Sequence, residues 1–191
     1  FAAFDKVSEA VWAAQRQSEI AALPDRVLAG RDLRNASLLG AQMEGADLSR
    51  ARLEGARLAR VRLEWASLWR ARLEGADLWN TRLQRAFLRE ARLAGAKLLS
   101  VRLEGADLTS ARLAGAYLQE VRLEGADLRW ARLEGVNLIY VGLSASTSLQ
   151  EAILQGAAWR ATDLSDVTVS SDQLNATFGD GSVILPGGKG P

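Results

Sequence analysis

Arginine and glutamate recur at fixed spacing in the middle of the chain, and they are the residues whose charge could do chemistry. Arginine returns every ten residues from Arg52 to Arg132, and a glutamate follows two residues after most of them. Guanidinium groups bind phosphates or carboxylates through paired hydrogen bonds, so a row of arginines could hold a polyanion. The glutamates at the same spacing would compete for each guanidinium. This pattern favours ion pairs on a solvated face over a phosphate-binding row.

The side chains that most often carry catalysis are absent from the sequence. The 191 residues include 0 His and 0 Cys, which removes the commonest general base, the commonest metal ligand and thiol chemistry. No glycine-rich phosphate loop precedes a predicted helix, and the carboxylates recur because the sequence itself repeats. We therefore expect no enzyme activity, no catalytic residue, no cofactor and no metal site.

A five-residue repeat positions the charged residues. From Arg31 to Ala145 the sequence divides into 23 pentads without a gap, with Leu at the third position of all but one, which has Met43. The first position is usually Ala. A period of five makes no apolar stripe on an α-helix and alternates between the two faces of a flat strand. The pattern therefore predicts short extended pieces, with residues one and three inward, joined by corners that wind the chain into a coil.

The run Ala71–Leu78 (ARLEGADL), repeated at Val101–Leu108 with Val for Ala, resembles the A(D/N)LXX signature of pentapeptide-repeat proteins. The resemblance covers roughly residues 31–170. It implies an all-β solenoid, a right-handed quadrilateral parallel β-helix with four pentads in each coil. We expect about seven coils, with an N-terminal α-helix and a short C-terminal helical cap.

The sequence divides into three parts. Residues 1–30 are predicted to be an N-terminal helical cap or tether, because residues 3–22 contain neither Gly nor Pro. Residues 31–169 are predicted to form the β-helix, with a one-residue register shift at 144–148 that acts as a bulge or a loosened corner. Residues 170–191 are predicted to be a C-terminal cap and tail. In that part, Ser170 or Ser171 would cap a helix that runs through Phe178 and is closed by Gly179.

Outward residues at the same place in successive coils form columns in this fold, and one column is mostly apolar. It contains Leu39, Ala59, Trp79, Leu99, Gln119 and Ile139, with Tyr117 and Tyr140 beside it. A second aromatic group on neighbouring corners could extend this surface: Trp65, Trp69, Phe87 and Trp130. A continuous apolar stripe usually marks a contact with another molecule, or it is covered by the N-terminal segment or a terminal cap.

We expect a non-catalytic protein–protein interaction scaffold that presents rigid faces to a protein partner or to a second copy of itself. The best-known functional subgroup of the resembled family inhibits DNA gyrase by mimicking duplex DNA, and this is the alternative function. Mimicry requires a strongly acidic surface, whereas this chain has 24 basic and 23 acidic residues and a net charge of +1. The alternative is therefore disfavoured, and no nucleic-acid binding is expected.

No apolar run is long enough to span a membrane, so no transmembrane segment is expected in this chain. The sequence starts at Phe1 rather than Met, which leaves open a membrane tether upstream. The tail from Phe178 to Pro186 is similar to the C-terminus of a group of bacterial pentapeptide-repeat proteins, many of which carry membrane segments before the repeats. We expect a cytoplasmic or membrane-associated protein of a bacterium.

Overall fold

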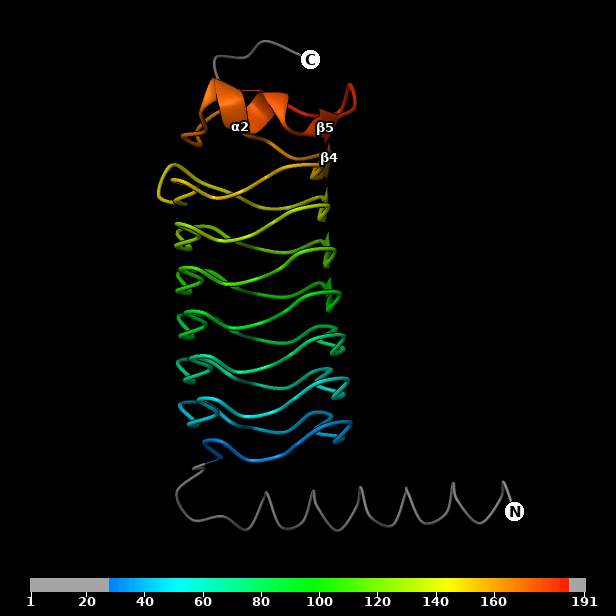
Figure 1. Cartoon of the computed structure of the whole chain (residues 1–191), viewed down its shortest axis with the longest axis vertical. Coiled ribbons are helices and arrows are strands. Elements are labelled where there is room, and N and C mark those ends of the chain that lie inside the picture. Colours follow the sequence, from blue (N-terminus) through cyan, green and yellow to red (C-terminus); the bar gives the residue numbers. More distant parts are fainter. Residues whose placement is uncertain (1–27, 186–191) are drawn as a thin grey trace, which may run out of the picture.

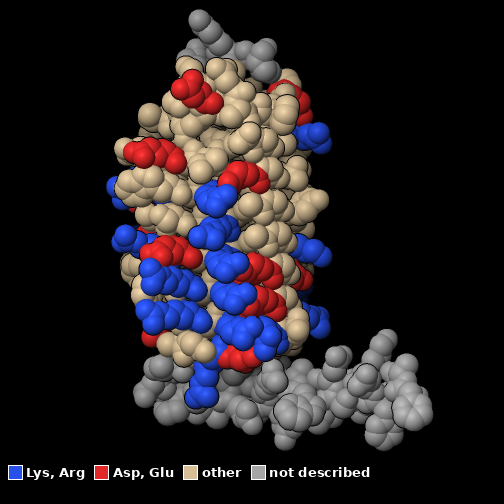
Figure 2. Space-filling model, viewed as in Figure 1, with Lys and Arg blue, Asp and Glu red and all other residues tan. Residues whose placement is uncertain are grey.

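The chain winds into an upright solenoid (Figure 1), described by a computed structural model for residues 28–185. In most pentads the first and third side chains are buried, while the second, fourth and fifth are partly or fully exposed. The inward positions predicted from the sequence are therefore confirmed. The outward positions give the solenoid a surface on which basic and acidic side chains form columns (Figure 2).

Parallel pairing joins each residue to its equivalent four pentads later, so four pentads complete one coil. Asp32 bridges Arg52, and bridges at the same interval recur every fifth residue along the coil. The solenoid thus has four faces. We name them by the pentads of one coil, together with the equivalent pentads of the other coils: face A contains 51–55, face B 56–60, face C 61–65 and face D 66–70.

Pairing is most extended on face B, where short strands form one parallel sheet in the order β1-β2-β3-β4-β5. The strands are β1 (Lys97–Leu99), β2 (Tyr117–Gln119), β3 (Asn137–Ile139), β4 (Ala158–Arg160) and β5 (Phe178–Gly179). Their outward side chains alternate with one buried residue in each of the first four strands. Face B therefore has the most extended pairing between coils among the described residues.

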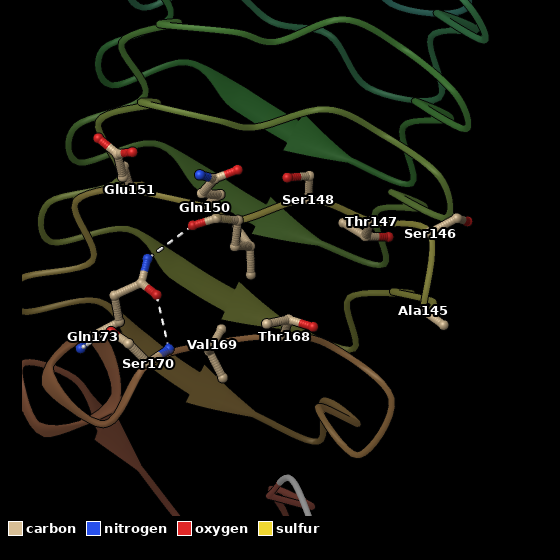
Figure 3. A pocket seen from close by; sticks show the side chains of 11 residues that line it. Ala145, Ser146, Thr147, Ser148, Gln150, Glu151, Thr168, Val169, Ser170 and Gln173 are labelled. Atoms are coloured by element: carbon tan, nitrogen blue, oxygen red, sulfur yellow. Dashed lines mark hydrogen bonds between the residues drawn. The ribbon is translucent and has the colours of Figure 1, made fainter.

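The register changes by one residue at the turn around Ser144–Ser148. Arg122 pairs with Gly142, one full coil later, whereas the partner of Asp127 is Ser148, one position beyond a full coil. The turn is fixed from inside by the buried Thr147 hydroxyl, which donates to the Leu123 carbonyl at 2.9 Å and accepts from the Ser144 N–H at 3.1 Å. Figure 3 shows this turn facing the segment around Val169.

The C-terminal end departs from the predicted helix. Helix α2 spans only Ser171–Asn175 and begins with a capping box, in which the side chains of Ser170 and Gln173 accept each other's backbone N–H groups. The prediction that the helix runs through Phe178 is wrong, because Phe178–Gly179 pairs with β4 as strand β5. Ladder pairing thus continues past residue 169. The predicted helix at 3–22 lies outside the described residues.

The corners require a left-handed backbone at the fifth position. At Gly55 φ is +66°, and the N–H of Ala56 donates to the Leu53 carbonyl at 3.0 Å, as in a type II turn. A Cβ on Gly55 would lie 2.5 Å from Oδ1 of Asn35, but this exposed side chain can move aside, so the positive φ is the reason for glycine there. Other corners place larger residues in this conformation, such as Trp65 with φ 64° and Arg85 with φ 57°. The left-handed conformation of a residue with a side chain costs about 1–2 kcal/mol at each of these corners.

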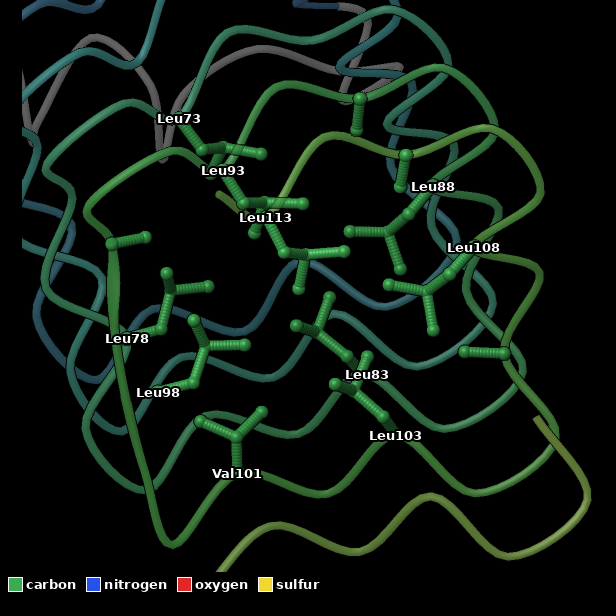
Figure 4. Close-up of a cluster of buried hydrophobic side chains, with 14 of the residues drawn as sticks. Leu73, Leu78, Leu83, Leu88, Leu93, Leu98, Val101, Leu103, Leu108 and Leu113 are labelled. Carbon is green, nitrogen blue, oxygen red and sulfur yellow. The ribbon is translucent and has the colours of Figure 1, made fainter. Parts of the chain in front are cut away.

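Leucines from successive coils stack in four columns inside the solenoid (Figure 4). Leu83 and Leu103 are each 0% exposed. Each buried leucine contributes roughly 1.5–3 kcal/mol relative to an exposed one. Alanine fills most inner first positions, but on face C a β-branched column replaces it: Val61, Thr81, Val101, Val121 and Val141. The buried Thr81 hydroxyl is satisfied by the Leu58 carbonyl at 2.7 Å.

Candidate interaction surfaces

Faces A and C carry the predicted arginines and glutamates as ladders of ion pairs. On face A, Glu54 lies 3.7 Å from Arg52 in its own coil and 3.0 Å from Arg72 in the next coil. Glu104 bridges two arginines of face C in the same way, at 3.1 and 3.2 Å. Each exposed pair contributes only about 0.2–1 kcal/mol. Where arginine and glutamate alternate along a ladder, as on face C, each carboxylate offsets one guanidinium, so that face is largely self-neutralising.

The face A ladder is interrupted in its middle coils. Ala94 and Ala114 stand where glutamates stand in other coils. Arg112 lies between them, and within residues 28–185 its side chain forms no ion pair. Figure 2 shows acidic side chains beside parts of a basic column and missing from other parts of it. Arg112 is therefore an exposed surface position on face A that lies outside the ion-pair ladder.

Face B carries the predicted apolar stripe in place of an ion-pair ladder. Tyr117 and Tyr140 are its most exposed members, at 57% and 61%. Leu39, Trp79 and Leu99 are also exposed. Ile139 is partly buried. The prediction that Ala59 points outward in this stripe is wrong, because Ala59 is buried. Its short side chain lies in the column between the larger Leu39 and Trp79.

Arginines stack on the tryptophans of both aromatic regions. On face B the guanidinium of Arg60 lies 4.6 Å from the ring centroid of Trp79. On face D the Trp69 ring has two such neighbours, Arg50 and Arg70, each at 4.6 Å. Cation–π contacts of this kind cover ring faces and contribute about 0.5–1 kcal/mol at exposed sites. Arginine therefore covers part of the exposed aromatic surface.

The second aromatic group does not extend the apolar stripe. Trp65, at the corner before face D, stacks under Arg85 at 4.8 Å, and Trp69 and Phe87 belong to face D itself. Around one coil the leucine columns of the four faces follow in chain order, so face D is opposite face B (Figure 4). Trp65 thus lies at the corner next to the one that carries Tyr140, whereas Trp69 and Phe87 lie on the face opposite the stripe. Trp69 and Trp79 are two pentads apart, which is half a coil.

Trp130 is also separate from this group, since it lies three coils beyond Arg70 at the corner between faces D and A. Its indole N–H donates to Glu151 at 2.9 Å, and Arg129 lies 5.4 Å from its ring centroid. The arginine stacks were not predicted from the sequence, but a signal was present. Arg50 and Arg60 each precede their tryptophan by one position less than a full coil, which places the two side chains side by side in adjacent coils.

A carboxylate–guanidinium clamp lies on face D beside these aromatic residues. Arg129 donates from Nε to Oδ1 of Asp127 at 2.9 Å and from Nη2 to Oδ2 at 2.6 Å. The side-chain hydrogen bond from Arg129 is the main cause that lowers the pKa of Asp127, although partial burial opposes it. The clamp is intramolecular, so it fixes the surface without leaving a free charge.

Asp127→Asn tests the clamp through its pH dependence. A carboxyl whose native pKa lies below its ordinary value of 3.8 stabilises the fold above that pH, and this contribution is lost as pH falls through the native pKa. We expect the variant to lose about 0.5–1.5 kcal/mol of unfolding free energy at pH 7, by urea denaturation, and less under acid conditions. The control is Asp107→Asn, because Asp107 accepts the Thr109 N–H and is attracted to Arg129 only through space, without the paired hydrogen bonds of the clamp. An equal loss at pH 2 and pH 7 would contradict the assignment.

The repeating pentads also match a known family. The family described as Pentapeptide repeats matches the sequence in 8 copies, over residues 28–64, 56–93, 71–109 and 102–139. Together these matches span more than half of the chain. The chain belongs to the pentapeptide-repeat family. Family membership implies a right-handed β-helix, and the parallel pairing between coils agrees with it.

Solved pentapeptide-repeat structures resemble this chain. The pentapeptide repeat protein Rfr23 from the cyanobacterium Cyanothece 51142 is 27% identical with a TM-score of 0.57, and the match covers 58% of this chain and 89% of Rfr23. HetL, involved in heterocyst differentiation regulation in Nostoc sp. strain PCC 7120, is 27% identical with a TM-score of 0.47, covering 91% and 97% of the two chains. The plasmid-mediated fluoroquinolone resistance protein QnrB1 is 19% identical with a TM-score of 0.46, covering 85% and 79%. No curated protein matches the sequence.

Pentapeptide-repeat proteins are generally structural or interaction proteins rather than enzymes. Among residues 28–185, no cluster of three or more acidic side chains is arranged to hold a metal ion. In the same residues, no helix has the length and apolar character needed to cross a bilayer.

Proposed function

We propose that this pentapeptide-repeat chain is a non-catalytic interaction scaffold that binds an apolar surface of a protein partner through face B. The observation that carries the proposal is the replacement of the ion-pair ladder by exposed Trp79, Leu99, Tyr117 and Tyr140 on this face. Exposed apolar patches on proteins usually mark contacts, and Trp and Tyr are enriched among the residues that dominate binding energy.

The backbone beneath the stripe supports this proposal. Strands β1 to β3 place Leu99, Gln119 and Ile139 in one in-register column. Their central leucines are buried, so the outward side chains stand on a packed and rigid core. Binding to a preorganised surface costs less conformational entropy than binding to one that must order first. Lys97 and Arg57 on the same face can provide polar contacts at its edges.

The charge distribution supports a scaffold over a mimic of duplex DNA. A mimic needs carboxylates in place of phosphates along one side of the rod. On faces A and C the second positions are mostly arginine, and the glutamates beside them are bound to those arginines. These faces therefore lack the strong negative potential that mimicry requires.

Photo-crosslinking from two faces tests the proposal in cells that produce the protein naturally. Benzoyl-phenylalanine at Tyr117 should crosslink one discrete protein species, whereas the same probe at Arg112 on face A should not. Adding Trp79→Glu with Leu99→Glu should abolish the Tyr117 product, because two carboxylates would be desolvated in the contact. Similar yields from both faces, or a Tyr117 product that survives the two substitutions, would refute face B as the binding surface.

Light scattering then identifies whether the species is a second copy. A wild-type dimer that becomes a monomer with Trp79→Glu and Leu99→Glu means self-association, whereas a monomer in both cases means a different protein. Trp79 and Leu99 are 38% and 37% exposed and lie outside the core, so the variant should stay folded with a loss of about 1–2 kcal/mol, which includes the lost stack of Arg60 on Trp79.

A further inference from the structure

A groove opens on face D near the C-terminal end, on the side opposite to face B. Its volume is about 610 Å³, and it is lined by residues 145–151 on one side and by 168–170 with Gln173 on the other (Figure 3). This volume lies in the range of about 300–1,000 Å³ that is usual for ligand clefts. Its lining is mixed, with hydroxyl and amide side chains alongside apolar Leu149 and Val169.

The ladder between coils is complete on the N-terminal side of this groove. Ser148 donates its N–H to the Ala126 carbonyl at 3.0 Å and accepts the Leu128 N–H at 2.8 Å. The Gln150 carbonyl accepts the Trp130 N–H at 3.1 Å. This is the three-bond pattern that joins pentads throughout the solenoid, so residues 147–151 have the backbone conformation of an ordinary pentad strand.

The ladder is open on the groove side of the same strand. By the pattern of the other coils, the Thr147 carbonyl, the Leu149 N–H and the Glu151 N–H should pair with the next coil. Within residues 28–185 none of these three groups has a backbone partner. An acceptor followed by two donors is thus presented at the spacing of a parallel strand.

Helix α2 explains why the next coil does not fill this position. The chain leaves the ladder at 168–170 to start α2, and the Gln173 side chain holds that helix against the coil. Its Nε2 donates to the carbonyls of Leu149 and Ala152, at 2.8 and 2.9 Å. The side chain satisfies carbonyl groups at the edge of the groove but supplies nothing to the three open groups.

We propose that this groove is a strand-insertion site, which takes an extended peptide segment of a partner protein as one added parallel strand. One peptide residue donates its N–H to Thr147 and accepts the Leu149 N–H, and the carbonyl two residues later accepts the Glu151 N–H. The residue between them faces Leu149 and the interior. The peptide therefore has the pattern polar–apolar–polar, like the pentads of this chain.

Main-chain complementarity favours a peptide as the occupant. The open groups are backbone groups of one strand, and their donor and acceptor order matches the backbone of another extended chain. An unpaired strand edge is a template for pairing with further polypeptide. The outward peptide residues would lie beside Ser148 and Gln150, whose uncharged side chains favour polar neighbours over a particular charge.

The probe is an acetylated and amidated peptide with the sequence of Ala106–Ser110 (ADLTS), the pentad that occupies face D two coils below. It is titrated into ¹⁵N-labelled full-length protein, and amide chemical shifts are followed by NMR. We expect saturable shifts at Leu149, Glu151 and Gln173. N-methylation of the peptide Asp removes the N–H that would donate to Thr147, and it should weaken binding by at least about tenfold. N-methylation of the peptide Leu, whose N–H points away from residues 147–151, should weaken it less.

Three results would overturn the proposal: no saturable shift at millimolar peptide, equal binding of the Asp-methylated peptide, or shifts confined to other faces. The variant with Trp79→Glu and Leu99→Glu should bind the peptide as wild type does, because face B is on the opposite side. Failure of the groove and failure of the face B contact are therefore separately visible.

Discussion

Leu83→Lys is expected to abolish the cooperative unfolding transition of the solenoid. Leu83 is 0% exposed and stands in a column between the leucines one coil below and one coil above. An ammonium group in this column has no carboxylate or water to pair with, and its effective desolvation costs several kcal/mol. The loss of packing adds to that cost. We expect at least about 4 kcal/mol of destabilisation, a large part of the stability of an ordinary domain.

The measurement is thermal and urea unfolding followed by far-UV circular dichroism. Arg82→Lys is the matched control, because it is the outward neighbour in the same pentad and keeps the positive charge. Its only ion pair within residues 28–185, with Glu64 at 3.8 Å, is long, so we expect a change within about 0.5 kcal/mol. A Leu83→Lys protein that melts cooperatively near the wild-type temperature would show that the third position is not the core.

Thr147→Val is expected to destabilise the protein by about 1–3 kcal/mol although it preserves the size of the side chain. The Thr147 hydroxyl donates to the Leu123 carbonyl at 2.9 Å and accepts from the N–H groups of Ser144 and Gly125, at 3.1 and 3.2 Å. Thr147 is only 4% exposed, so water cannot easily replace these bonds. Valine would leave the Ser144 N–H without a partner at the turn where the register changes, while the Leu123 carbonyl keeps the Ala126 N–H and the Gly125 N–H keeps the Ser144 hydroxyl.

Urea denaturation gives the loss of stability, and hydrogen exchange at the Ser144 amide locates it. Thr168→Val is the matched control, since Thr168 is exposed and its hydroxyl forms no hydrogen bond within residues 28–185. A Thr147→Val protein that is as stable as the control would mean that the turn is held by its backbone alone.

The core could be predicted from the sequence because one residue type marks it in each pentad. Leucines such as Leu53 and Leu58 can share an interior only if the chain turns after every five residues, so the inward positions follow from spacing. The number of faces does not follow from spacing. It came from the resemblance to pentapeptide-repeat proteins, and the pairing of Asp32 with Arg52 agrees with it.

The surface could be predicted only column by column. The exposed stripe on face B follows from residue numbers, but the burial of Ala59 depends on the length of its neighbours in the column. The placement of Trp69 opposite Trp79 was available from their spacing of two pentads. The end of α2 was not, because Phe178 pairs with β4 through the backbone and any residue type can do so.

The groove had the weakest signal in the sequence. It arises from backbone bonds that are not made beside Thr147 and Leu149, and no residue type encodes a missing bond. The one visible trace was the extra residue at 144–148. The extra residue marked where the register of the ladder changes. It did not indicate that the following coil would fail to pair with residues 147–151.

A solenoid transmits stability only between neighbouring coils, so each junction acts as a link in a chain of coupled units. The open ladder beside Thr147–Glu151 makes the junction with the following coil, from residue 168 onward, a weak link among the described coils. We therefore expect α2 and β5 to melt as a separate block, while β4 stays paired with β3 and the leucine columns before Ser144 remain intact. A ligand that completes the ladder would couple the two blocks. Binding in the groove would therefore make the two blocks unfold in one cooperative transition.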